Sequence, residues 1–299
     1  MRESRTASAF AGTTDKAGLV MRASIGGKHM KAGPTKPERR AGESVARALL
    51  LVLALGSSAA SAAGDGDWGF GAKLSYDRAE GTYGTQAKSN DASTTLLLSA
   101  DSENHSFDLS LPYVAQTGPG RRVILAGRRA VVIVESGKTA MGMGDVTLGA
   151  TRYLLNEEKH GVDLDAGLSY KFATASESRG LGTGKNDVAV QASLARSFGA
   201  ATFSISAGYT FVGKPEGQDL RNSGFASFDA SVRLASGLNA GATFGYGAAS
   251  VSGAPSSRDV TYYLNYRLSK KHKVEVYVLD GHSTQSPDRG AGATFSVDF

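Results

Sequence analysis

The sequence predicts an all-β chain that closes into an antiparallel transmembrane β-barrel of about twelve strands. Two observations predict it: apolar and polar residues alternate in segments of about ten residues, and short turns alternate with long connections. In the closing segment 291–299, alanine, phenylalanine and valine share one parity, while glycine, threonine, serine and Asp298 share the other. Because successive side chains of a strand face opposite sides, this segment has one apolar face and one polar face.

The same alternation recurs from Trp68 onward. In one segment, valine, leucine, alanine and aromatic residues alternate with Asp163, Asp165 and Lys171. Segments of about ten residues fit a tilted strand that crosses the hydrocarbon layer of a membrane. The predicted strands are 68–76, 93–101, 106–114, 146–150, 162–172, 187–198, 201–212, 225–235, 238–248, 260–268, 273–278 and 291–299.

The connections between these segments support a membrane barrel over a soluble β-sandwich. Five are short: 102–104, 156–161, 199–200, 236–237 and 269–271. The other six are longer, about 10 to 30 residues, and are rich in Gly, Ser, Asp and Lys. Short periplasmic turns and long exterior loops are typical of outer-membrane barrels. In lipid every backbone polar group must be paired, so the sheet must close.

Residues 1–62 are predicted to be a signal peptide, which leaves 63–299 as the barrel. The apolar run 48–56 is too short to span a bilayer. Arg39, Arg40 and Arg47 precede it and small residues follow it, with a cleavage site after Ala60-Ser-Ala62. The alternative is a short buried helix. The n-region is unusually long, so Met21 or Met30 is a plausible true start.

Charge and cysteine content exclude several functions. Residues 1–62 hold ten of the 33 Lys and Arg and four of the 28 Asp and Glu, so the remainder carries 23 basic and 24 acidic residues. The high isoelectric point therefore belongs to the leader, and no basic footprint for nucleic acid remains. The absence of cysteine excludes a disulfide framework, a thiolate metal site and a cysteine nucleophile.

The polar parity of the strands is predicted to line a hydrated interior. Both signs of charge occur on it, so no ion selectivity is predicted, and opposite charges that merely brace the wall are the alternative. Alternation places Arg152 and Arg196 on the lipid face near the turns, unless a bulge shifts the register. The predicted lumen-lining residues are Lys73, Asp108, Asp163, Asp165, Lys171, Asp229, Arg233, Asn239, Asn265, Arg267, Lys273, Glu275 and Asp298.

The longest connection, about 117–142, is the predicted gate. It holds two apolar runs flanked by Arg121, Arg122, Arg128 and Arg129. Such a sequence is unsuited to a free loop in water. It is expected to enter the barrel as a constriction, to form a helix or hairpin at the rim, or to lie on lipopolysaccharide.

Motifs of catalysis are weak. Residues 180–185 are similar to a phosphate-binding loop, but Arg179 and Asn186 stand where that motif requires Gly and Ser or Thr. Neither the zinc motif H-E-x-x-H nor the hydrolase motif G-x-S-x-G occurs. His282 and Ser283 beside Asp280 and Asp288 leave a hydrolase dyad conceivable, but the chain is predicted not to be an enzyme and to need no cofactor or metal.

Three segments resemble one family. They are 111–120 (LPYVAQTGPG), 142–151 (GMGDVTLGAT) and 171–187 (KFATASESRGLGTGKND), with 277–288 similar to that family's last exterior loop. Together they resemble the outer-membrane transporters of the phenol-degradation meta-pathway type. Where that family often has Tyr-Arg after the G-x-G-D-x-x-L-G segment, this chain has Arg152-Tyr153. The resemblance implies a monomeric channel for small compounds, hydrophobic or aromatic ones among them.

The predicted function is therefore an outer-membrane channel that passes small molecules through a narrow polar lumen. Twelve strands enclose a lumen between those of filled eight-stranded barrels and open sixteen-stranded porins. The expected partners are outer-membrane lipid and lipopolysaccharide, a small solute and the barrel assembly machinery. The alternatives are an outer-membrane lipid hydrolase and a plugged structural or adhesion barrel.

Overall fold

The structure is a computed structural model, and it describes residues 21–24, 68–83, 88–118, 122–126, 129–133, 139–215, 219–251 and 253–299. For residues 21–24, 122–126 and 129–133 it describes the backbone alone. Apart from 21–24, the predicted leader lies outside the described residues. Within the part described, no helix has both the length and the apolar character needed to span a membrane.

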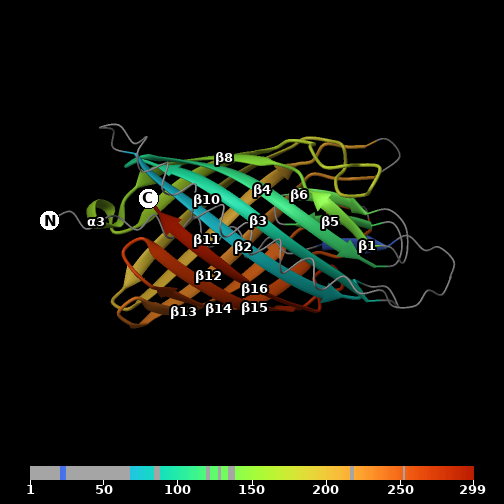
Figure 1. Cartoon of the computed structure of the whole chain (residues 1–299). Coiled ribbons are helices and arrows are strands. Elements are labelled where there is room, and N and C mark those ends of the chain that lie inside the picture. Colours follow the sequence, from blue (N-terminus) through green and yellow to red (C-terminus); the bar gives the residue numbers. More distant parts are fainter. Residues whose placement is uncertain are drawn as a thin grey trace.

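The chain folds into a closed antiparallel barrel of twelve strands, which confirms the predicted fold class (Figure 1). Each strand pairs with the next along the chain, and β16 pairs with β2 to close the sheet. The barrel elements are β2 (Gly69–Gly81), β3 (Ser89–Asp101), β4 (His105–Thr117), β7 (Thr139–Met143), β8 (Thr147–Leu155), β9 (Asp163–Lys171), β10 (Asp187–Phe198), β11 (Ala201–Phe211), β12 (Ser223–Ala235), β13 (Leu238–Gly247), β14 (Ser257–Arg267), β15 (His272–Gly281) and β16 (Arg289–Asp298).

The elements β7 and β8 together form one strand of the wall. Both pair with β4: β7 pairs with residues 113–117 and β8 with residues 105–110. Residues 144–146 interrupt them, and the Gly144 N–H donates to the Pro112 carbonyl at 2.8 Å. The predicted long loop was therefore wrong at both ends, because Thr117 lies in β4 and residues 139–142 lie in β7.

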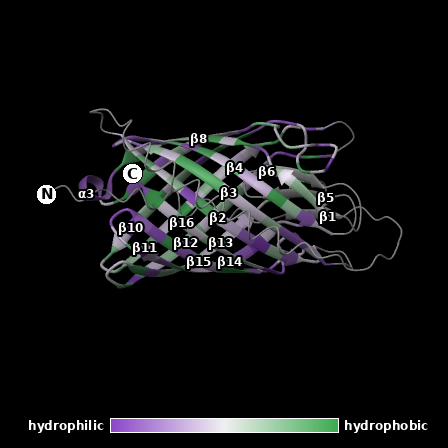
Figure 2. Ribbon diagram, viewed as in Figure 1, coloured by the Kyte–Doolittle hydropathy of each residue, from purple (hydrophilic) through white to green (hydrophobic). Residues whose placement is uncertain are grey.

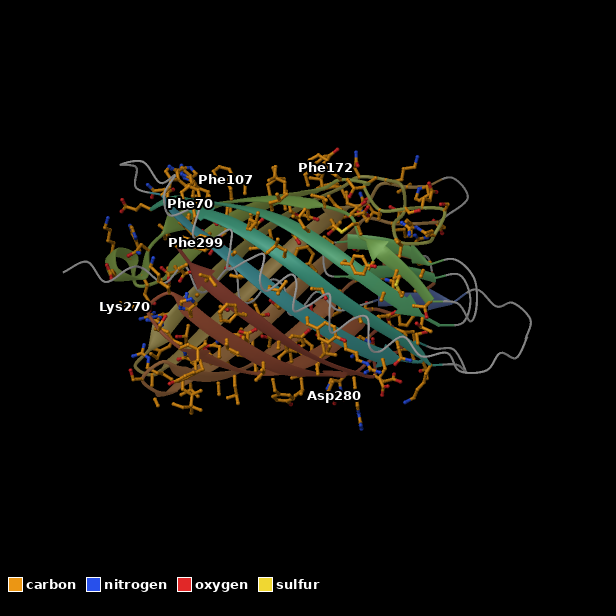
Figure 3. All side chains as sticks on the ribbon, viewed as in Figure 1. Phe70, Phe107, Phe172, Lys270, Asp280 and Phe299 are labelled. Atoms are coloured by element: carbon orange, nitrogen blue, oxygen red, sulfur yellow. The ribbon has the colours of Figure 1, made fainter. Side chains whose placement is uncertain are left out.

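The side chains are distributed in the reverse of a soluble protein: large apolar residues cover the outside and polar residues are buried (Figure 2). On β10, Ser193 is 8% exposed and its neighbour Leu194 is 42% exposed. Phe107 and Phe172 project from the outer surface in Figure 3. An exposed apolar band around a polar interior is the arrangement that lipid requires of a barrel.

The two arginines that alternation assigned to the lipid face do lie there. Arg152 is exposed on β8, and the bulge in that strand comes later, between Tyr153 and Leu155. Arg196 is exposed on β10, where its guanidinium lies 4.8 Å from the ring centre of Phe198. Both lie near the turns, where a charge on a barrel exterior costs little.

The two ends of the barrel differ, and we call them the turn end and the loop end. At the turn end, 156–162 contains the short helix α3 (Glu157–His160), which Asn156 caps by accepting from the Glu158 N–H. At the loop end, connections 82–88 and 282–288 are shorter than predicted because their strands extend further. A separate sheet contains β1 (Met21–Ser24), β5 (Arg122–Ala126) and β6 (Arg129–Ile133).

Candidate functional site

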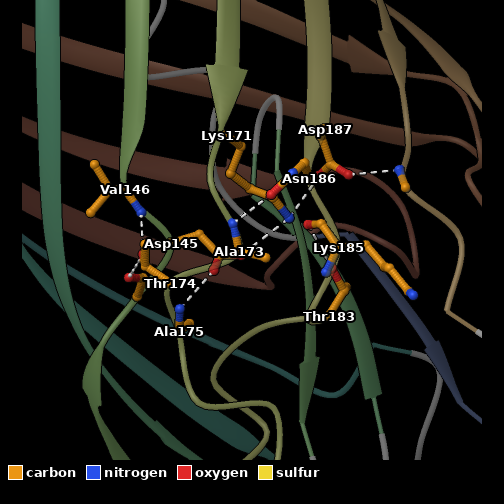
Figure 4. A network of polar contacts seen from close by, with 12 residues as sticks. Asp145, Val146, Lys171, Ala173, Thr174, Ala175, Thr183, Lys185, Asn186 and Asp187 are labelled. Carbon is orange, nitrogen blue, oxygen red and sulfur yellow. Dashed lines mark hydrogen bonds and ion pairs between the residues drawn. The ribbon is translucent and has the colours of Figure 1, made fainter.

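A buried charge cluster lies at the loop end of the barrel, at the base of the loop 172–186 (Figure 4). Lys171 Nζ lies 2.8 Å from Asp187 Oδ2 and 3.1 Å from Asp145 Oδ2, and all three side chains are at most 2% exposed. Lys171 ends β9, Asp187 begins β10, and Asp145 lies in the break between β7 and β8. The cluster therefore ties three neighbouring parts of the wall together.

The same carboxylates also hold the loops through backbone N–H groups. Asp145 Oδ1 accepts from the Ala175 N–H at 2.9 Å, and Asp187 Oδ1 accepts from the Gly213 N–H at 2.8 Å. The Asn186 side chain accepts from the Ala173 N–H at 2.9 Å. Hydrogen bonds to a carboxylate are stronger than those between neutral groups, so the loop 172–186 has a fixed course.

This loop packs against the inner face of the wall. Met141 and Met143 on β7 are exposed to the outside, so Gly142 between them faces inward. A Cβ on Gly142 would lie only 2.8 Å from Leu181 Cδ1, and Leu181 is fully buried. Arg179 Nη1 donates to the Met141 carbonyl at 3.4 Å. The middle of the loop thus lies inside the loop end of the barrel.

The connection 282–288 also lies inward. Ser286 is fully buried; its hydroxyl donates to the Arg258 carbonyl at 2.6 Å and accepts from the Arg258 N–H at 2.9 Å. A Cβ on Gly281 would lie 1.8 Å from the Pro287 carbonyl oxygen, so this position has no room for a side chain. Nearby, Tyr83 is 1% exposed and donates to Asp91 Oδ2 at 3.3 Å. Two loops and one tyrosine therefore narrow this end.

Deeper in the barrel, tyrosines cross glycines to reach aspartates. The Tyr263 hydroxyl contacts both oxygens of Asp229, at 3.0 and 3.1 Å. Its ring lies over Gly241, where a Cβ would come within 2.4 Å of it. On the other side, the Tyr277 hydroxyl donates to Asp77 Oδ1 at 2.5 Å and the ring lies over Gly292. Each tyrosine spans one strand and joins two others.

The predicted lumen residues all lie on the parity of the strands that carries the buried polar groups, but at different depths. Asp165, Lys171 and Asp229 are buried. Arg233, Arg267 and Asp298 are exposed at the turn end, where Asp298 pairs with Lys273 at 3.1 Å. The half-buried ones are Lys73, Asp108, Asp163, Asn239, Asn265, Lys273 and Glu275.

The structure adds polar residues that the sequence reasoning did not include. Asp77, Asp91, Asp187, Asp259 and Tyr263 belong to the same parity, so the alternation itself was sufficient to find them. Asp145 lies outside any strand, and periodicity gave no signal for it. Only its place in the G-x-G-D-x-x-L-G segment marked it.

The predicted gate is mostly beyond what the structure describes. Arg121 and Arg128 lie outside the described residues. Arg122 belongs to β5 and Arg129 to β6, and these two strands pair with each other. Their backbone course is that of a hairpin, which was one of the forms expected for this segment.

The conceivable hydrolase dyad does not assemble. His282 Nε2 lies 3.6 Å from Asp280 Oδ2, whereas the Ser283 hydroxyl lies 3.1 Å from the Ser286 hydroxyl. The segment similar to a phosphate loop, 180–185, lies within the loop 172–186, and Thr183 there bonds to the backbone of Lys185. Among the described residues, no group of three or more His, Cys, Asp or Glu side chains is arranged to hold a metal ion.

Solved structures similar to the chain show the same fold. The COG4313 outer membrane channel from Pseudomonas putida F1 has a TM-score of 0.60 at 14% identity, covering 79% of this chain and 97% of that one. The KdgM porin has a TM-score of 0.49 at 10% identity, covering 76% and 99%. The P. putida toluene transporter TodX has a TM-score of 0.40 at 12% identity, covering 80% and 91%.

No curated protein matches the sequence. The sequence pattern of one family, described as "Putative MetA-pathway of phenol degradation", matches residues 81–299. This match covers all barrel strands after β2, together with the segments that form the charge cluster at the loop end. The chain therefore belongs to this family of phenol-degradation meta-pathway type, as its resemblance to that family predicted.

Proposed function

We propose that the chain is an outer-membrane channel that passes small solutes along the polar interior of the barrel. One observation carries the proposal: the buried side chains are mainly polar, and they alternate with apolar side chains exposed on the outside. A barrel with this distribution places its polar face around a path through the membrane. The described strands contain no packed apolar interior that would make it a soluble barrel instead.

The solutes are proposed to be small molecules, hydrophobic or aromatic ones among them. The family description refers to phenol degradation, which supports aromatic compounds as the class. The narrow loop end supports an upper limit on size, because Leu181, Pro287 and Tyr83 lie inside it. The predicted lumen-lining residues are proposed to form the wall that these solutes pass.

Two segments are proposed to control passage. The loop 172–186 is held inside the loop end by the Lys171 cluster. The segment about 117–142, with Arg121, Arg122, Arg128 and Arg129, is proposed to act as the outer gate, because its apolar runs need cover from water. Removing residues 121–135 should increase conductance, and an unchanged conductance would contradict a gate there.

The cellular setting follows from the same proposal. The chain is exported through residues 1–62, inserted by the barrel assembly machinery and held as a monomer among outer-membrane lipid and lipopolysaccharide.

Planar-bilayer recording of refolded residues 63–299 tests the channel. Discrete current steps are expected, and aromatic solutes that pass through the barrel should interrupt them. A folded barrel that stays silent would refute the proposal. Heat-unfolded protein from the same preparation serves as the control for contaminating porins.

A further inference from the structure

The buried charges of the barrel are strongly unbalanced. Among the described residues, six aspartates are less than 9% exposed: Asp91, Asp145, Asp165, Asp187, Asp229 and Asp259. Lys171 is the one basic side chain buried to this extent in the same residues, and it already pairs with two of the six. Burying a carboxylate without a compensating charge is costly. Mobile cations inside the barrel would supply that compensation.

The excess of carboxylates is accompanied by unsatisfied polar groups. Asp165 Oδ1 and both side-chain amide atoms of Gln191 are buried without a hydrogen-bond partner among the described residues. On the wall formed by β12, β13 and β14, the hydroxyl of Thr261 is likewise buried and unpartnered, and the side chain is 1% exposed. Such groups need a ligand or water.

The Thr261 hydroxyl lies within an acidic part of this wall. Thr261 is the cross-strand partner of Thr243, and Thr243 is the partner of Asp229. The Thr243 hydroxyl donates to Asp229 Oδ2 at 2.6 Å, so that carboxylate keeps its charge facing the interior. Asp259, on the same face of β14 as Thr261, is 4% exposed. Its cross-strand neighbours are Gly245 and Gly281, which offer it no side-chain partner.

We propose that Asp229, Asp259 and Thr261 form a binding site for a monovalent cation and that the barrel conducts cations in preference to anions. The inference rests on the proposed channel function and adds the charge class of what passes. The ligand is an alkali-metal ion or an organic ammonium group, which share a single positive charge. A divalent ion is disfavoured because calcium takes six to eight oxygen ligands, and no suitable group of ligands occurs among the described residues.

Reversal potentials across a tenfold KCl gradient test the inference, with residues 63–299 in a planar bilayer at pH 8. Potassium should permeate several times better than chloride. Asp259→Asn and Asp229→Asn should each reduce that permeability ratio by about threefold, the effect in water of one unit charge roughly 7 Å away. The same recordings with tetramethylammonium chloride show whether an organic ammonium ion shares the path.

Asp280→Asn is the matched control. Asp280 lies on the strand beside Asp259, is the cross-strand partner of Val260 and is exposed on the outer face. Its removal takes away the same charge near the same height and should leave selectivity unchanged. Thr261→Val keeps both carboxylates and should reduce the ratio less than the aspartate variants.

The outcomes separate the inference from the function on which it rests. A silent, folded barrel would refute the channel and the inference together. A barrel that conducts with equal or greater permeability to chloride would refute the inference alone. Cation preference that Asp259→Asn and Asp280→Asn alter equally would refute the site on β12–β14.

Discussion

Lys171 and Asp187 close the base of a loop that folds into the barrel. Lys171 Nζ lies 2.8 Å from Asp187 Oδ2, the two residues are cross-strand partners, and each side chain is at most 2% exposed. Asp145 adds a second carboxylate at 3.1 Å. The pair therefore links the wall to the segment that narrows its loop end.

Lys171→Met should destabilise the barrel strongly. It leaves two buried carboxylates without their cation, and removing one partner of a buried pair typically costs about 3–5 kcal/mol. The free energy of unfolding, measured by urea titration in detergent micelles, checks this. Lys88→Met is the control, because the Lys88–Glu80 pair is exposed at 3.5 Å and should contribute at most about 1 kcal/mol.

The Lys171→Met and Asp187→Asn double variant should recover part of the lost stability, because it removes one of the two stranded charges. A double variant less stable than Lys171→Met alone would contradict the charge argument.

Tyr263→Phe should lower the free energy of unfolding by about 1.5–3 kcal/mol, the range for a hydrogen bond to a charged group. The ring would still cover Gly241, so the loss reports the bond to Asp229 alone. Tyr262→Phe, on the exposed outer face of the same strand, is the matched control. Equal losses in the two variants would show that the Tyr263 bond adds nothing.

Arginine substitutions on the outer face of β14 should depend on depth. Leu264→Arg places a charge on the apolar band and should cost about 2–4 kcal/mol, whereas Leu268→Arg lies at the turn end and should cost about 0–1 kcal/mol. Both leucines are exposed, at 47% and 55%. Unfolding in lipid vesicles measures the difference. Equal costs would contradict the assignment of this face to lipid.

Shortening the loop 172–186 by residues 177–182 should increase single-channel conductance. The deletion withdraws Leu181 from the inner face of Gly142 and leaves Lys171, Asp145 and Asp187 in place. Heat-modifiable migration on gels verifies that the variant is folded. A folded variant with the conductance of the full chain would place this loop outside the conducting path.

The sequence predicted the barrel because a period of two leaves a direct trace in each strand. The segment 187–198 coincides with β10, and alternation correctly kept Arg196 on the outer face. It missed β7, where Met141 and Met143 alternate with only alanine and glycine, so the wall strand was read as loop.

The partners of individual charges could not be predicted in the same way. Alternation places Lys171 and Asp229 on the inner face, but it cannot say that one meets Asp145 and the other Tyr263. Those contacts depend on the stagger between strands and on Gly241, which lets a ring cross its strand. The inward course of the loop 172–186 was missed because the segment reads as an ordinary glycine-rich loop.

The most direct test of a polar path uses the absence of cysteine from the chain. Asn265→Cys lies on the inner face of β14, and Leu264→Cys, the preceding residue, lies on the outer face. A charged methanethiosulfonate reagent applied in water during recording should change the current of Asn265→Cys and leave Leu264→Cys unaffected. Reaction of Leu264→Cys, or a folded, conducting Asn265→Cys barrel whose current the reagent leaves unchanged, would contradict a water-filled interior behind a lipid-facing wall.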